Sequence, residues 1–165
     1  MGAVDEDVNP YSGRIIHKRR NVSTPERMWD ETTFASTDSE RVPAAYLVPA
    51  SEKAVLERLR AHGIVMEPLG AAGAGPVPAL EAFQVASSTV TPQAFESHQE
   101  RTVTGTWAAI EPRDLAGAIR VPMTQKLARL AFYLLEPRSN DGLATWNVVD
   151  EAIKDSRYPV LRTRN

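Results

Sequence analysis

The sequence offers one short pattern that could do metal or acid–base chemistry, His98-Gln99-Glu100. On a strand, the side chains of His98 and Glu100 would project from the same face, because side chains two positions apart share a face. A zinc site needs at least a third protein ligand, which His62 or an acidic residue would have to supply. The competing interpretation, which we favour, is a charged loop before a strand that begins at Arg101. We therefore predict no metal site, with His98 and Glu100 as the candidates if one exists.

Patterns for nucleophilic catalysis are absent from the sequence. No Gly-x-Ser-x-Gly sequence, typical of many serine hydrolases, occurs. The chain also has no cysteine, which excludes thiol catalysis, thiolate metal sites and disulfides. We predict that this chain carries no catalytic residue and no cofactor of its own.

A polar cluster follows the most apolar stretch of the chain. It could bind a carbohydrate or a peptide end, with Trp146 as an apolar platform and carboxylates as hydrogen-bond acceptors. The alternative is structural, with Asp141-Gly142 in a left-handed turn and Trp146 docking the next helix onto the core. The candidate ligand-binding residues are Glu136, Asn140, Asp141, Trp146 and Asn147, with Asp150 close by.

Composition describes an ordinary globular domain. A chain of 165 residues can bury roughly 70% of its unfolded surface. Lys+Arg number 19 against Asp+Glu 21, so no excess of positive charge favours nucleic acid. No apolar run approaches the ~20 residues of a membrane span, and the acidic N-terminus does not resemble a signal peptide. We predict no nucleic-acid or membrane partner. The composition does not indicate a cellular compartment.

The composition of the chain changes near residue 41. Residues 1–41 are polar and contain the turn signals Asn9-Pro10 and Thr24-Pro25, which predict an extended lead-in or linker. Residues 42–165 are predicted to form a single β-rich domain. Its first strand, between Pro43 and Pro49, is expected near a sheet edge, because proline cannot donate to a strand ladder.

Two long segments of the domain alternate apolar and polar residues with period two. They are Glu81–Thr89 and Arg101–Ile110. Strands with one apolar face and one solvent-exposed face favour antiparallel pairing. Helices are predicted after a Ser51 cap as far as Gly63, over 125–136 and over 143–153. The expected fold is α+β and β-rich, with an antiparallel, sandwich-like sheet and two or three packed helices.

Six segments of the sequence form a recognisable series, and the longest of them is the most specific. The segments are residues 42–50, 59–64, 95–98, 127–143, 146–147 and 158–160. In this order, from about Val42 to the end, they resemble the region C-terminal to the catalytic domain in large bacterial zinc metallocarboxypeptidase-like proteins. The resemblance implies a β-rich, sandwich-like C-terminal module attached to a carboxypeptidase A-like hydrolase.

Zinc ligands of that family cannot be transferred to this chain. The family binds zinc through a His-x-x-Glu pair and a distant histidine, with a late glutamate for proton transfer. Each of the three histidines here, His17, His62 and His98, lacks a glutamate three positions later. The resemblance therefore implies that zinc belongs to the parent protein and not to this chain.

Two hypotheses follow from the sequence. In the first, the chain is a non-catalytic accessory domain whose partner is an adjacent catalytic domain, and it serves docking, substrate gating or folding. It would then be a truncated form, a separately encoded fragment or a paralogue, of a parent expected to be secreted or in the cell envelope. In the second, it is a stand-alone β-sandwich module that binds carbohydrate or peptide through the Trp146 loop. Both leave self-association open.

Overall fold

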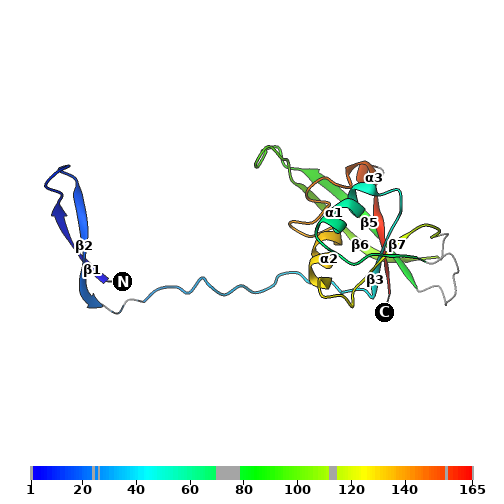
Figure 1. Cartoon of the computed structure of the whole chain (residues 1–165), viewed down its shortest axis with the longest axis horizontal. Coiled ribbons are helices and arrows are strands. Elements are labelled where there is room, and N and C mark those ends of the chain that lie inside the picture. The colour runs from blue at the N-terminus through cyan, green and yellow to red at the C-terminus, as the bar shows by residue number, and fades with distance from the viewer. Residues whose placement is uncertain are drawn as a thin grey trace. The chain divides into compact units, whose positions relative to one another are not determined.

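The structure is a computed structural model that describes residues 2–23, 25, 27–69, 79–111, 115–154 and 156–164. The chain forms two compact units, residues 1–39 and residues 40–165 (Figure 1). Each unit is described by itself below. Within the described residues, no helix is both long enough and apolar enough to cross a membrane.

The N-terminal unit is a β-hairpin of strands β1 (Gly2–Val8) and β2 (Ile15–Ser23). Asn9 holds the turn, because its side-chain oxygen accepts the backbone N–H groups of Tyr11 and Ser12. Exposed ion pairs, such as Asp5 with Arg20, join the two strands. Sequence analysis expected only an extended lead-in here. The hairpin was missed because nearly all residues of β2 are exposed, so no apolar stripe marks the strand in the sequence.

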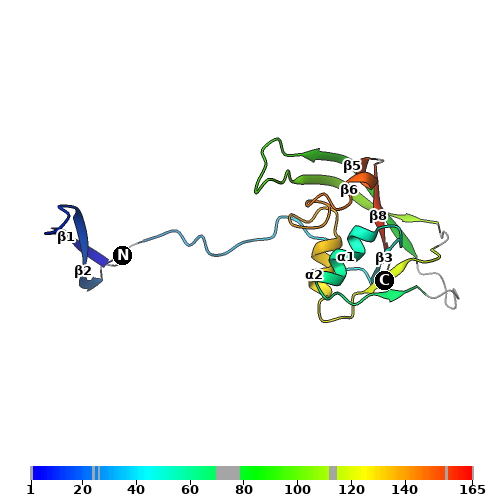
Figure 2. The ribbon, with the colours of Figure 1, turned by 45° about the horizontal axis from the view of Figure 1, so that its top comes forward.

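The second unit is built on a six-stranded sheet in the order β4-β7-β3-β8-β5-β6. Every neighbouring pair in this sheet is antiparallel. Strands β5 and β6 continue beyond the other strands as a two-stranded arm (Figures 1 and 2). The strands are β3 (Ala45–Val48), β4 (Glu67–Pro68), β5 (Leu80–Val90), β6 (Arg101–Ile110), β7 (Ile119–Pro122) and β8 (Arg157–Thr163).

The described residues of this unit also form three helices: α1 (Lys53–Ala61), α2 (Ala128–Leu135) and α3 (Asp150–Lys154). Helix α1 ends before Gly63, whose φ of 71° supplies the predicted left-handed stop. The predicted Ser51 cap is wrong, because Glu52 occupies the cap position and no side chain caps the helix. Helix α3 is much shorter than predicted, since residues 141–149 form turns and bends.

The core lies between the helices and one face of the sheet. In β3, Tyr46 and Val48 point into this core, whereas Leu47 points to the opposite face and packs with Leu80 and Leu161. The members contributed by α1, α2 and α3 include Val55, Leu59, Ala131, Leu134, Leu135 and Ile153. The antiparallel sheet with its packed helices confirms the predicted β-rich, sandwich-like α+β class.

Strand β3 is not an edge strand, which corrects the prediction made from its flanking prolines. It lies between β7 and β8 and pairs with both. Pro43 and Pro49 flank the strand from outside its bounds, so neither proline removes a ladder hydrogen bond. All four residues of β3 are buried, as is typical of a central strand.

Candidate functional site

Glu136 directly follows α2 and lies in a buried polar cluster of the second unit. The residue is only 5% exposed. One carboxylate oxygen accepts the Tyr46 hydroxyl, and the other accepts Trp107 Nε1 at 3.0 Å. Sequence analysis proposed Glu136, at the end of the predicted helix 125–136, as a ligand-binding residue. The structure places it in the core, because the chain leaves α2 in an extended conformation at this position and turns the side chain inward.

Arg162 on β8 connects this cluster to the beginning of the unit. Its Nε lies 2.6 Å from Glu81 Oε2, and its Nη1 lies 3.0 Å from Glu40 Oε1. The guanidinium also covers the Trp107 ring, with 4.4 Å to the ring centroid. Period-two alternation explains this placement, because Arg162 shares the core-facing side of β8 with Tyr158 and Val160.

Burial sets the protonation behaviour of the cluster. Burial raises the pKa of Glu136 above its ordinary value, although the bonds from Tyr46 and Trp107 and the charge of Arg162 oppose this. For Glu40, burial also acts to raise the pKa, but the Arg41 backbone N–H and Arg162 outweigh it and lower the pKa. The side chains of this cluster form their hydrogen bonds and ion pairs with one another inside the domain. The cluster around Arg162 and Glu136 therefore fits a structural role, as an internal clamp, better than a catalytic centre.

The tip of the β5–β6 arm contacts the loop that contains Trp146. Residues Glu96 and Ser97 both have positive φ, of 49° and 67°, in the turn between Phe95 and His98. The ring of His98 stacks on Trp146, with centroids 4.7 Å apart and planes inclined by 28°. Two candidates that the sequence treated separately are thus brought together.

Trp146 sits at the surface of this contact. Its side chain is 37% exposed, and its Nε1 donates to the Asp141 carboxylate. The structural interpretation of the sequence expected Trp146 to dock α3 onto the core, and this expectation is wrong. His98 Nε2 is buried and has no hydrogen-bond partner among the described residues.

The remaining candidates lie elsewhere. Glu100 and Asn140 line a small polar pocket of about 170 Å³. Asn147 occupies a left-handed position, with φ of 59°, and donates its backbone N–H to Ala144. The predicted ligand set is therefore divided among the core, the Trp146 contact and this pocket. Within the part of the chain that is described, no group of three or more His, Asp or Glu side chains could hold a metal ion.

Gly142 differs from its expected role. The sequence suggested a left-handed turn at Asp141-Gly142, but the positive φ of this loop falls on Asn147 instead. Gly142 is needed for close approach, because a Cβ atom there would lie 2.9 Å from both Ser139 Cβ and the Tyr133 carbonyl oxygen. The glycine therefore lets the loop fold back against the end of α2.

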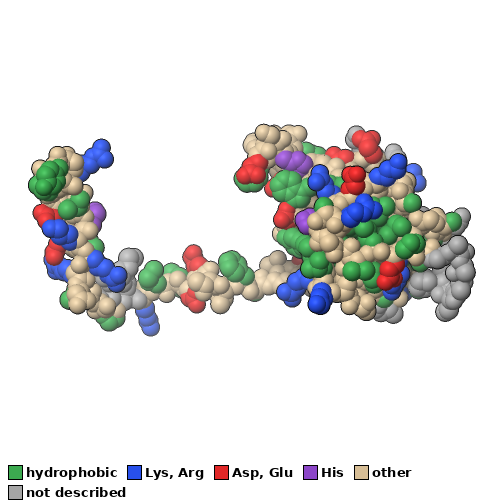
Figure 3. Space-filling model, viewed as in Figure 1, with side chains coloured by type: hydrophobic (Ala, Val, Ile, Leu, Met, Phe, Trp, Pro, Cys, Tyr) green, Lys and Arg blue, Asp and Glu red, His purple; other side chains and the backbone are tan. Residues whose placement is uncertain are grey.

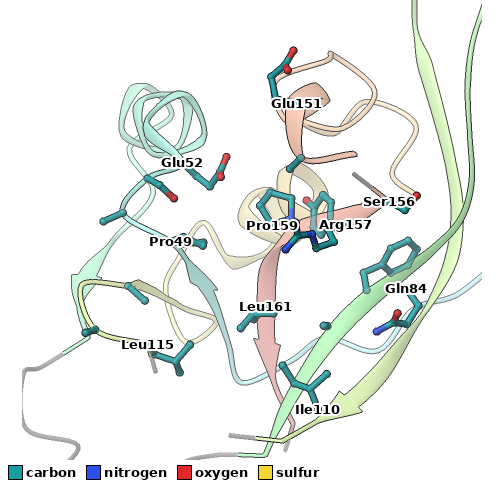
Figure 4. Close-up of a pocket in the computed structure, with 18 residues that line it drawn as sticks. Pro49, Glu52, Gln84, Ile110, Leu115, Glu151, Ser156, Arg157, Pro159 and Leu161 are labelled. Atoms are coloured by element: carbon teal, nitrogen blue, oxygen red, sulfur yellow. The ribbon is translucent and has the colours of Figure 1, made fainter. Parts of the chain in front are cut away.

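A groove of about 900 Å³ lies in the second unit, and the sequence did not indicate it. Its apolar lining includes Leu161 and Ile110, from the sheet face opposite the helices, together with Leu115. Figure 4 shows Glu52 and Glu151 above this lining, with Arg157 beside Pro159 on β8. An apolar floor with a charged rim suits a peptide segment or the surface of another domain.

The pattern in the sequence that could have indicated this groove is the presence of apolar residues on both faces of the central strands. Leu47, Leu80 and Leu161 form a second apolar cluster on the side away from the helices. A strand pattern with apolar residues on both faces indicates that each face is covered or hollowed. Recognising the groove also required the strand order, which brings β8 beside β5.

The sequence of this chain is similar to those of several known proteins. It is 34% identical over 122 residues to Carboxypeptidase 2 of Trichophyton equinum, covering 74% of this chain and 22% of the relative. Carboxypeptidase 2 of Trichophyton rubrum is 32% identical over 122 residues, with the same two coverages of 74% and 22%. Probable carboxypeptidase 2 of Arthroderma benhamiae is 36% identical over 101 residues, covering 61% of this chain and 19% of the relative.

The chain thus spans about a fifth of the length of the curated relatives that it matches. No family model matches the chain, and no solved structure matches it. The relatives are fungal, whereas the sequence resemblance was to bacterial proteins. The expected relationship to carboxypeptidases is supported at this coarser level: the chain is related to one region of proteins named Carboxypeptidase 2.

Proposed function

We propose that this chain is a non-catalytic accessory region of a zinc metallocarboxypeptidase-like protein. The observation that carries the proposal is the extent of the similarity, which covers most of this chain and only about a fifth of each carboxypeptidase relative. The absence of His-x-x-Glu from the full sequence is consistent with a zinc site held by another part of the parent. The partner in this proposal is the catalytic domain of that parent.

Two features of the second unit support a role beside another domain. The internal clamp around Arg162 and Glu136 fixes β8, β5 and α2 as one rigid support. The groove of about 900 Å³ leaves apolar side chains of the sheet open to a partner. Covering such a surface is favourable by roughly 25 cal/mol per Å² of apolar area removed from water. Docking, substrate gating and assistance in folding all fit this arrangement.

The first experiment measures zinc and hydrolysis with the purified chain. After incubation with zinc and desalting, we expect less than one tenth of an equivalent of bound metal, an order-of-magnitude threshold for a site without a full ligand set. We also expect no release of C-terminal amino acids from peptides. Stoichiometric zinc, or hydrolysis that a chelator abolishes, would contradict the non-catalytic assignment.

The second experiment uses a relative that contains the corresponding region. Deleting that region from Carboxypeptidase 2 of Trichophyton equinum should lower its yield, its Tm or its kcat/KM, and inserting this chain in its place should restore them. The matched control inserts the chain with Gly105→Ala, which should not restore them because the sheet is disrupted. A deletion that changes none of the three quantities would rule out an accessory role.

A second candidate function is the binding of a glycan or peptide by the Trp146 loop. The observation that favours it is the indole, which stays 37% exposed beside the Asp141 carboxylate. A glycan and peptide array should then yield a ligand whose binding is lost in Trp146→Ala. An array without any ligand, or a ligand that binds the variant equally well, would exclude this function.

A further inference from the structure

Strand β6 is the last strand of the six-stranded sheet and pairs only with β5. At its beginning the free edge is occupied, because the Arg101 backbone N–H donates to the Thr145 carbonyl oxygen at 3.1 Å. Beyond Arg101, no described residue outside β5 exchanges a backbone hydrogen bond with β6. The edge from Thr104 to Ile110 is therefore open to another strand.

This open edge lacks the features that usually protect sheet edges. Natural proteins block such edges with lysine, proline, inward-pointing charges or a bulge. Residues 102–110 contain no charged residue and no proline. The one shift of register in the β5–β6 pair, between Val85 and Ser87, adds its extra residue to β5 and none to β6. The side chains of Thr104 and Thr106 are exposed on this strand.

We propose that β6 pairs antiparallel with β6 of a second copy of this chain. Because the Arg101 N–H points away from β5 and β6 contains no extra residue, alternation turns the backbone groups of Gly105, Trp107 and Ala109 outward as well. Pairing centred on Trp107 uses these three positions and leaves Arg101 with Thr145. Such a pairing forms about six backbone hydrogen bonds across the two-fold axis.

The edge is complementary to itself in this register. Thr104 faces Ile110 of the second copy, and Thr106 faces Ala108, so no like charges meet. On the core-facing side the two Trp107 residues lie opposite each other, and cross-strand aromatic pairs are favourable. Residues 102–110 offer no counter-charge to a strongly charged strand, whereas they can pair with themselves without bringing like charges together. We therefore assign a second copy as the occupant.

Sedimentation analysis of the full chain over about 5–200 μM tests this pairing. The wild type should form a dimer, and Thr106→Lys should weaken dimerisation by at least about tenfold, because it places two like charges near the axis. Ala109→Pro should have the same effect, since it removes an outward N–H without touching the bonds to β5. Circular dichroism should show both variants folded.

The matched control is Thr102→Lys. Thr102 is exposed on the same face of the same strand but lies at the end covered by Thr145. The control should dimerise like the wild type. A wild type that is monomeric at about 200 μM, or a dimer that survives both test variants, would overturn the proposal. Equal weakening by Thr102→Lys and Thr106→Lys would also overturn it, as would binding of an added peptide to β6 of a monomeric wild type. This inference does not depend on the proposed function.

Discussion

Arg162 and Glu81 lie opposite each other on neighbouring strands β8 and β5, with 2.6 Å between Arg162 Nε and Glu81 Oε2. Both side chains are less than a tenth exposed. Removing two charges from water is costly, and the cost is offset only when each charge keeps all its partners. The pair therefore holds only in this strand register, and Glu40 extends it to the first residue of the second unit.

Replacing the guanidinium should destabilise the domain strongly. We expect Arg162→Met to lower the free energy of unfolding by about 3 kcal/mol or more, because Glu81 and Glu136 would remain buried without this cation. Methionine keeps an apolar stem over Trp107, so the loss reports the charge. Urea denaturation followed by tryptophan fluorescence measures it.

The matched control is Arg120→Met. Arg120 pairs with Glu67 at 2.8 Å, but the two side chains are 37% and 52% exposed. Surface pairs of this kind contribute about 0–1 kcal/mol. Figure 3 shows that acidic and basic side chains are interspersed over the visible face of this unit. Equal losses for the two variants would contradict the special role of Arg162.

The stability of the domain should depend on pH through Glu136. Burial raises its pKa above the usual value of 4.5. A raised carboxyl pKa means that the folded state binds the proton more tightly than the unfolded state. The contribution is therefore complete below about pH 4.5 and is lost as the pH rises through the folded pKa.

Comparison with Glu136→Gln isolates this effect, because glutamine does not titrate. We expect the unfolding free energy of the variant, minus that of the wild type, to increase as the pH rises above about 4.5. Glu40 has a lowered pKa, and its contribution is lost only as the pH falls below the same region. Denaturation curves at several pH values provide the measurement, and a difference independent of pH would refute the prediction.

A side chain at residue 105 should disrupt the sheet. A Cβ atom there would lie 2.1 Å from the Gln84 carbonyl oxygen and 2.7 Å from Phe83 Cε1. Because the first contact is with backbone, we expect Gly105→Ala to cost about 3 kcal/mol or more. Gly63→Ala is the control, since its Cβ would meet only Leu127 Cδ1 at 3.9 Å. Its left-handed φ of 71° should cost about 1–2 kcal/mol. Thermal unfolding should rank the two variants in this order.

The stack of His98 on Trp146 should couple the arm to the loop. A double-mutant cycle with His98→Ala and Trp146→Ala should give an interaction energy of about 0.5–1.5 kcal/mol, typical of stacked aromatic pairs. In Trp146→Ala, the His98 ring protons should lose the ring-current shift from the indole, which NMR detects directly. Additive effects of the two substitutions would show that the two rings do not interact in solution.

Local patterns predicted much of the fold. The period-two segments became β5 and β6, Gly63 ended α1, and the apolar stretch after residue 125 became the buried helix α2. Helix α2 begins at Ala128 rather than Gln125, because the Gln125 side chain instead bonds the backbone of Val65 and Pro122. That contact joins residues 60 positions apart in the chain, which no local pattern reports.

For the candidate site, the sequence supplied the residues but not their grouping. Glu136 and Trp146 are only ten positions apart, yet one is in the core and the other contacts His98 at the surface. The exit of the chain from α2 and the return of the β5–β6 arm decide this separation. Neither event leaves a mark in composition or periodicity.

The sequence by itself determined the class of the fold, the absence of His-x-x-Glu and the relationship to a region of carboxypeptidases, because residue types and their local periods carry this information. Only the tertiary structure decided which charges meet inside the domain, since Glu40 and Arg162 are 122 positions apart. It also decided that β6 ends the sheet with an open edge. Strand order and register arise from long-range pairing, and the same alternating segment could occupy the centre or the edge of a sheet.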